Sequence, residues 1–198
     1  MWTTLPNLLT LGRIALIPVI VTLVWPGIEN RHTCFWAMVL YAIGGITDVF
    51  DGLLARRYGQ VTVLGKFLDP LSDKLVYVTT LVALLQLQGP RVPPWLVMIV
   101  LGRELSITGL RAIAISEGVV IDAKEGGKIK TFLGTIGMCG LLVHYPYLIN
   151  YGPVSTIVNF HVAGLWISFF SVAFSVYSGI DYVRSFLRAV RARPQRPT

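Results

Sequence analysis

Long apolar runs, separated by short segments with charges, glycines or prolines, make up most of this chain. Six runs are long enough to cross the hydrocarbon core of a bilayer as helices, which takes about 20 residues. They cover residues 8–25, 33–55, 68–88, 93–116, 130–149 and 157–183. None shows the sustained period-two alternation of a membrane barrel strand. The pattern therefore predicts an all-α, polytopic membrane protein with six transmembrane helices.

Composition supports a membrane protein. Hydrophobic residues make up 54% of the 198 positions and charged residues only 14%, whereas soluble domains carry about 25% charged residues. The first run is longer than a signal-peptide core and is expected to remain as a span. No inverted repeat of the transporter kind and no low-complexity linker divides the chain, so residues 1–198 are expected to form one integral membrane domain.

Basic residues lie mostly on one side of the predicted bundle. The opposite loops hold only Arg31 and Arg91, whereas the side that both termini share is basic. Its residues are Arg13, Arg56, Arg57, Lys66, Lys74, Lys124, Lys128, Lys130, Arg184, Arg188, Arg191, Arg193 and Arg196. Short basic loops are retained in the cytoplasm. We therefore expect a multi-pass protein of the cell (inner) membrane with cytoplasmic termini, and we read the net charge of +7 as a topology signal rather than a nucleic-acid footprint.

Four aspartates lie near the cytoplasmic ends of the second and third runs. Asp48 and Asp51 are three residues apart, Asp69 and Asp73 four apart, so each pair shares a helix face. A short connection brings the two faces together. Each close pair of ionised carboxylates would repel by on the order of 4 kcal/mol at an effective dielectric near 20, so the cluster would separate or become protonated unless cations neutralised it. Oxygen ligands without histidine or cysteine predict Mg²⁺ or Mn²⁺ rather than zinc.

Two glycines and an arginine accompany these acids. Gly52 follows Asp51 and Gly65 precedes Asp69 by four residues, where a ligand could approach the backbone closely. Arg56 can offer a guanidinium fork to phosphate oxygens. Helix packing by small residues and an interfacial arginine are the structural alternatives. Together with the carboxylates, these residues indicate a diphosphate site.

The complete pattern D-x2-D-G-x2-A-R-x8-G-x3-D-x3-D, residues 48–73, resembles the signature of the CDP-alcohol phosphotransferase family. Its members are integral membrane enzymes that transfer a phosphate-linked group from a CDP-activated donor to an alcohol and release CMP. The family has a six-helix, usually dimeric membrane fold, so the resemblance implies a homodimer and a single catalytic domain with its active site at the cytoplasmic surface.

The resemblance also implies a role for each matching residue. Two metal ions would be held by Asp48, Asp51, Asp69 and Asp73. The CDP site would be lined by Gly52, Arg56 and Gly65. Asp73 matches the family's proposed general base, which takes the proton of the acceptor hydroxyl.

The opening stretch LPNLLTLGR places Asn7, Thr10 and Arg13 at three-residue steps on one helical face. An N-terminal cap with an interfacial arginine would explain this spacing equally well. The stretch resembles the start of phosphatidylglycerophosphate synthases and cardiolipin synthases, which implies that Asn7 and Thr10 contact CDP-diacylglycerol.

A second group of charges indicates a site for a phosphate on the acceptor. The fourth run contains GRELSITGLR, in which Arg103, Glu104 and Arg111 need a partner or a polar cavity. Arg103 could instead pair with a neighbouring carboxylate and lock the bundle. The next loop, AKEGGKIKT, adds lysines that topology alone would also explain. The predicted acceptor-phosphate ligands are Arg103, Arg111, Lys124, Lys128 and Lys130.

Both stretches resemble the phosphatidylglycerophosphate synthase branch of the family. The resemblance implies transfer of a phosphatidyl group from CDP-diacylglycerol to sn-glycerol 3-phosphate in phospholipid biosynthesis. A sibling enzyme of the cardiolipin synthase or inositol-phosphate type is the near alternative. A cation or proton transporter is the distant one, disfavoured because all four acids lie at one membrane face. Interfacial or packing roles are expected for His32, His144 and His161.

Overall fold

The computed structural model describes residues 5–58, 63–87, 91–116, 126–150, 152 and 155–191, without the side chains of 5–7, 9, 48–58, 63–70 and 126–130. These ranges contain six helices and one two-stranded hairpin. The helices are α1 (Leu5–Leu23), α2 (Arg31–Tyr58), α3 (Val63–Leu85), α4 (Pro94–Ser116), α5 (Gly126–Val143) and α6 (Phe160–Arg191). The strands β1 (Pro146–Asn150) and β2 (Ser155–Asn159) lie between α5 and α6. Six helices in the order of the six apolar runs confirm the predicted helical class.

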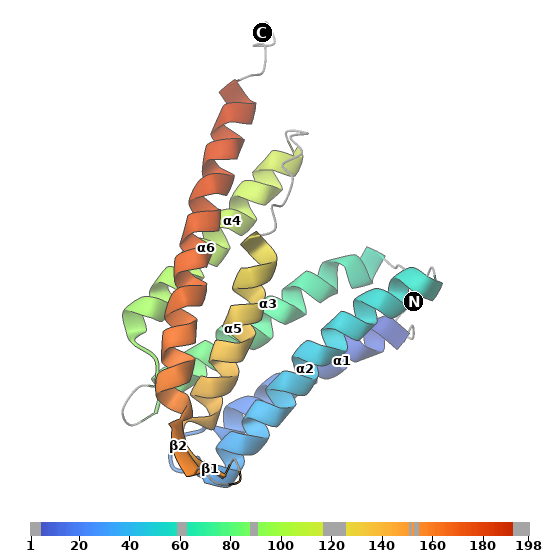
Figure 1. Cartoon of the computed structure of the whole chain (residues 1–198). Coiled ribbons are helices and arrows are strands. Elements are labelled where there is room, and N and C mark those ends of the chain that lie inside the picture. Colours follow the sequence, from blue (N-terminus) through green and yellow to red (C-terminus); the bar gives the residue numbers. More distant parts are fainter. Residues whose placement is uncertain are drawn as a thin grey trace, which may run out of the picture.

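The helices form two groups that meet at the hairpin end. α1 packs against α2 and α3, α5 packs along α6, α4 lies against α6, and α2 joins the groups by contacting α5. Figure 1 shows both groups converging at the hairpin and diverging away from it. The last part of α2 and the first part of α3 lie at the end far from the hairpin, close to the start of α1.

The apolar core lies where the two groups meet. Its members come from all six helices, and large side chains there are almost fully excluded from solvent. They include Ile20, Leu81, Leu84, Leu96, Met138, Leu141 and Leu142. Each such side chain contributes roughly 1.5–3 kcal/mol when it leaves water. Burial at this end therefore holds the two groups together.

α5 and α6 approach so closely that glycine is required at their contact. A Cβ on Gly140 would lie 2.7 Å from Cα of Gly164, and a Cβ on Gly164 would lie 2.6 Å from the backbone N of Leu141. Ser168 Oγ also donates to the carbonyl oxygen of Gly164 at 2.8 Å. Small residues at such positions let the backbones of membrane helices touch.

The hairpin replaces helix that the hydrophobic pattern predicted. The sequence analysis extended the fifth run to residue 149, but α5 ends at Val143, and Pro146 begins a strand paired antiparallel with Asn159. His144 adopts a left-handed backbone conformation (φ 58°). Pro146 lacks an amide N–H and disfavours helical geometry in the residue before it. This part of the helical prediction, and the start of the sixth run at residue 157, are therefore wrong.

Polar contacts fasten the hairpin end. Arg91 donates to Sγ of Cys34 at 3.3 Å and to the carbonyl oxygen of Leu142 at 3.2 Å, linking the segment before α4 to α2 and α5. His144 lies beyond the end of α5, with its Nδ1 3.3 Å from Nδ1 of His161. Burial, the Arg91 cation and His161 lower the pKa of His144 to about 4, so its ring is neutral at pH 7. The histidines thus pack against each other, as expected.

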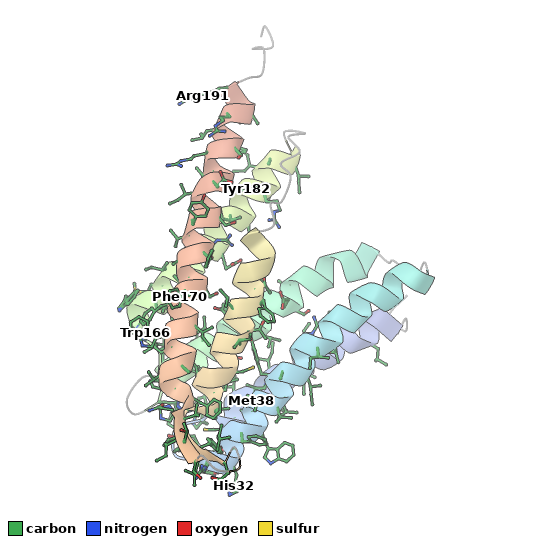
Figure 2. All side chains as sticks on the ribbon, in the orientation of Figure 1. His32, Met38, Trp166, Phe170, Tyr182 and Arg191 are labelled. Atoms are coloured by element: carbon green, nitrogen blue, oxygen red, sulfur yellow. The ribbon has the colours of Figure 1, made fainter. Side chains whose placement is uncertain are left out.

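The surface of α6 is apolar. α6 is the helix among the described residues that is long and apolar enough, by length and composition, to cross a membrane, and shorter apolar stretches cover Thr10–Leu23 and Thr131–Val143. Trp166 and Phe170 on α6 are 60% and 57% exposed (Figure 2). Such aromatic exposure is typical of a face that meets lipid. Six helices are confirmed, whereas six membrane crossings stay a prediction.

Replacing Gly140 with alanine is expected to destabilise the protein. The new methyl would lie 2.9 Å from the carbonyl oxygen of Phe160 and closer still to Gly164, and these backbone atoms can move only if the helices separate. Overpacking of this kind costs about 1–3 kcal/mol, so the midpoint of thermal denaturation in detergent should fall. Gly109→Ala is the matched control, because its Cβ would meet nothing within 4 Å. Equal midpoints for the two variants would contradict the prediction.

Candidate active site

The four aspartates of the sequence pattern lie on two consecutive helices. Asp48 and Asp51 belong to the second half of α2, and Asp69 and Asp73 to the first half of α3. These parts flank the α2–α3 connection, at the end of the molecule away from the hairpin (Figure 1). The side chain of Asp73 is exposed, and those of Asp48, Asp51 and Asp69 lie outside the described residues. The predicted helical placement agrees with the structure, whereas metal coordination stays a prediction.

The donor chemistry of this pattern suits a hard divalent cation. All four side chains offer carboxylate oxygens, which Mg²⁺ and Mn²⁺ accept as ligands. Among the side chains that the structure describes, no group of three or more His, Cys, Asp or Glu residues could hold a metal, and three of the four aspartates are outside that set. The pattern on α2 and α3 is therefore the candidate metal site.

Several other predicted ligands occupy helical positions whose side chains are not described. They are Asn7 in α1, Gly52 and Arg56 in α2, Gly65 in α3, and Lys128 and Lys130 in α5. Lys124 lies outside the described residues altogether. The structure assigns these residues to helices, except for Lys124, and their roles in binding stay predictions.

α1 brings two buried polar residues to the helix that carries Asp73. Thr10 is fully buried and Arg13 is 4% exposed. Nη1 of Arg13 donates to Oγ of the buried Ser72 at 3.3 Å. The stem of Arg13 also passes Gly44 of α2, where a Cβ would lie 3.7 Å from its Cγ. Because burying a guanidinium is costly without polar partners, Arg13 is placed to hold α1, α2 and α3 together beside Asp73.

A second set of polar contacts connects α3, α4 and α6. Nζ of Lys74 donates to Oγ1 of Thr108 at 2.6 Å and lies 3.9 Å from Oε2 of Glu104. Oε1 of Glu104 accepts from Nη1 of Arg103 at 2.9 Å. Nε of Arg103 donates to the backbone oxygen of Ser175 at 3.1 Å. We call these five residues the interhelical polar cluster.

Arg103 pairs with the carboxylate of Glu104. The sequence had left such a pair open as the structural alternative to phosphate binding. A guanidinium has five N–H donors, and the contacts to Glu104 and Ser175 use two of them. The remaining donors suit an anion, so binding of an acceptor phosphate stays a prediction for Arg103.

Arg111 lies two turns farther along α4 and is exposed. Its Cζ is 6.0 Å from the ring centroid of Tyr182 on α6, whose position Figure 2 marks. This distance is at the outer limit of a cation–π contact. The side chain is accessible to a soluble anion, which agrees with its predicted role without testing it.

Sequence reasoning missed Ser72, Lys74 and Thr108 as parts of the site. Ser72 and Lys74 flank Asp73, but neither is a specified position of the pattern. Thr108 lies four residues after Glu104 and so shares its helix face. A search for polar residues one turn from a charged residue in an apolar helix would have found Thr108. The contact of Arg13 with Ser72 has no local sequence signal.

Comparison with known proteins identifies the family. The model of the CDP-alcohol phosphatidyltransferase family matches residues 3–177. The chain belongs to this family. The match confirms the resemblance inferred from the aspartate pattern, and it includes α1 to α5 and the first half of α6.

Characterised relatives resemble this CDP-alcohol phosphatidyltransferase along most of its length. A probable phosphatidylglycerophosphate synthase of Mycobacterium tuberculosis is 37% identical over 187 residues, 94% of this chain and 83% of the relative. A CDP-diacylglycerol–glycerol-3-phosphate 3-phosphatidyltransferase of Bacillus subtilis is 36% identical over 189 residues, 90% of this chain and 92% of the relative. A CMP-forming cardiolipin synthase of Streptomyces coelicolor is 30% identical over 192 residues, which is 96% of this chain and 85% of the relative.

Arg13→Met is expected to lower turnover about tenfold or more, because Arg13 contacts Ser72 directly before Asp73 and small displacements of reacting groups have large effects on rate. The measurement is the rate of release of CMP, the product that the family signature implies. Arg31→Met is the matched control, since Arg31 is exposed at the hairpin end, where it donates to the oxygen of Pro146. Equal rates for both variants would contradict the role given to Arg13.

Proposed function

We propose that this protein transfers the phosphatidyl group of CDP-diacylglycerol to the 1-hydroxyl of sn-glycerol 3-phosphate, giving phosphatidylglycerophosphate and CMP in phospholipid biosynthesis. The observation that carries the proposal is the family match over residues 3–177, which includes the complete aspartate pattern on α2 and α3. The Mycobacterium tuberculosis and Bacillus subtilis relatives are named after this reaction or its product. They match this chain over 83% and 92% of their own lengths.

The donor would bind at the facing ends of α1, α2 and α3. Two Mg²⁺ or Mn²⁺ ions would be held by Asp48, Asp51, Asp69 and Asp73. Bound divalent ions offset the charge of a diphosphate and stabilise a leaving phosphate oxygen. The CDP-diacylglycerol site would be lined by Asn7, Thr10, Gly52, Arg56 and Gly65. Support comes from the burial of Thr10 and from the contact of the buried Arg13 with Ser72 of α3.

Asp73 would act as the general base. The acceptor hydroxyl gives its proton to the Asp73 carboxylate while its oxygen attacks the phosphorus that carries diacylglycerol, and the bond from that phosphorus to CMP breaks. Asp73 is exposed, which would allow a water-soluble acceptor to reach it. A carboxylate in this position can remove a proton at the moment the hydroxyl attacks.

The acceptor phosphate would be bound by cationic residues of α4, of α5 and of the sequence between these two helices. They are Arg103, Arg111, Lys124, Lys128 and Lys130. Arginine and lysine suit this task because they form charge-assisted bonds with phosphate oxygens. The second candidate reaction is cardiolipin synthesis with release of CMP, which the name of the Streptomyces coelicolor relative gives; that relative is less similar, at 30% identity. In this reaction the acceptor would be phosphatidylglycerol. An inositol phosphate is a further candidate acceptor.

The whole chain, residues 1–198, would be one catalytic domain in the inner membrane. Its six helices would cross the bilayer with both termini and the active site in the cytoplasm, and two copies would form a homodimer. The last turn of α6 carries Arg188 and Arg191, at the end opposite the hairpin (Figure 2). This basic end supports a cytoplasmic orientation.

The proposal is tested by measuring CMP release by the purified protein from CDP-diacylglycerol with Mg²⁺, Mn²⁺ or a chelator. The acceptors offered are sn-glycerol 3-phosphate, phosphatidylglycerol, inositol phosphate and serine. Release with sn-glycerol 3-phosphate, abolished by the chelator, is the expected result. Preference for another acceptor would replace the assignment, and no release with any acceptor would refute the transferase proposal.

Asp73→Asn should abolish turnover, because an amide cannot accept the hydroxyl proton, while it keeps the size of the side chain. Binding of CDP-diacylglycerol, measured in detergent by equilibrium binding, should be largely retained. Asp48→Asn should instead weaken binding of metal and donor together. Turnover at the wild-type rate in Asp73→Asn would rule out this residue as the base.

A further inference from the structure

The two halves of the proposed site lie on different groups of helices. The acids are on α2 and α3, whereas Arg103 and Arg111 are on α4. α3 packs mainly against α1, and α4 mainly against α6. Away from the hairpin the two groups diverge (Figure 1). The interhelical polar cluster connects them, and on α3 its member is Lys74, the residue directly after Asp73.

We propose that Glu104 is a positioning residue for the transfer. It holds the ammonium group of Lys74 and the guanidinium group of Arg103 in one cluster, so that the base on α3 and the acceptor site on α4 keep a constant separation. This inference rests on the proposed function and assigns a role to a residue that the metal pattern and the acceptor ligands do not include.

The geometry of Glu104 supports this role because its two oxygens serve different partners. Oε1 is 2.9 Å from Nη1 of Arg103 on the same helix, and Oε2 is 3.9 Å from Nζ of Lys74 on α3. The side chains of Arg103 and Glu104 are each 16% exposed. Shielding from water strengthens the Arg103–Glu104 contact relative to an open surface pair, whereas the side chain of Lys74 is 39% exposed.

Thr108 makes the position of Lys74 more specific. It lies one turn after Glu104 on α4, and its Oγ1 accepts from Nζ of Lys74 at 2.6 Å. The ammonium group is thus bound between two residues of the same helix face. A one-turn slide of α3 along α4 would break both contacts, so the pair sets the register of the two helices.

Arg103 extends this connection to α6. Its Nε donates to the backbone oxygen of Ser175 at 3.1 Å. Its stem runs past Gly179, where a Cβ would lie 3.6 Å from both Cγ and Nε. The backbone of α6 therefore fixes the position of Arg103, and through Arg103 the positions of Glu104 and Lys74.

The charges in the cluster also suit a phosphate-bearing acceptor. Glu104 offsets one of the two cations, which prevents Lys74 and Arg103 from repelling each other when the acceptor is absent. The oriented guanidinium can then receive an anion without first being ordered. The acceptor hydroxyl must meet Asp73 and the donor phosphorus together, and an error of about 1 Å in such an arrangement can cost on the order of 100-fold in rate.

Glu104→Gln tests the proposal by separating turnover from binding. We expect kcat to fall about tenfold or more, while KM for sn-glycerol 3-phosphate stays the same or falls, because both cations remain. Loss of a phosphate ligand would raise KM instead. The matched control is Glu29→Gln, which makes the same chemical change between α1 and α2 at the hairpin end. It should keep kcat within about twofold of the wild-type value.

A double-mutant cycle tests whether Lys74 and Glu104 act as one unit. Lys74→Met and Glu104→Gln should each lower kcat, and the double variant should lose no more than the worse single variant. Lys74→Arg, which keeps the cation, should recover part of the loss. If the fold-loss of kcat in the double variant equals the product of the two single losses, the residues act independently, and this result would overturn the proposal.

Folding of the Glu104→Gln variant is checked by gel filtration and thermal denaturation in detergent. If that variant does not fold, Thr108→Val tests the proposal instead, because it keeps every charge of the cluster. It should lower kcat with KM unchanged, and an unchanged kcat would overturn the proposal. Wild-type CMP release in the same assay separates the two proposals. An inactive wild type would overturn both, whereas an active wild type with an unaffected Glu104→Gln variant would overturn this inference alone.

Discussion

A charged side chain inside an apolar helical bundle needs polar partners, and this constraint determines how the helices of this protein are connected. A buried guanidinium without such partners would be strongly destabilising. Arg13 of α1 reaches α3, Arg91 reaches α2 and α5, and Arg103 of α4 reaches the backbone of α6. Each arginine therefore joins helices that apolar contacts alone would leave free to slide.

The two ends of the molecule differ because the packing differs. At the hairpin end, large side chains are buried and α5 contacts α6 closely at Gly140 and Gly164. At the other end the two groups of helices diverge (Figure 1), with α2 and α3 in one group and α4 in the other. The proposed metal ligands of α2 and α3 and the proposed acceptor ligands of α4 therefore belong to different groups of helices.

The metal pattern could be read from the sequence because it consists of local spacings. Asp48 and Asp51 share a helix face, as do Asp69 and Asp73, whatever the rest of the chain does. The family match over residues 3–177 agrees with that reading. The contacts that surround the pattern could not be read in the same way. Arg13 and Ser72 are 59 residues apart, and Arg103 and Ser175 are 72 apart, so no spacing rule relates them.

By itself, the sequence determined the six helices, the two aspartate pairs and the family, because hydrophobic period and short-range spacing act within single helices. The tertiary structure alone decided that residues 146–150 and 155–159 form two paired strands rather than the ends of two helices. It also decided that Arg103 pairs with Glu104, and that Lys74 joins α3 to α4. These outcomes depend on how closely and in what register the helices pack, and close approach is set by side chains from several helices at once.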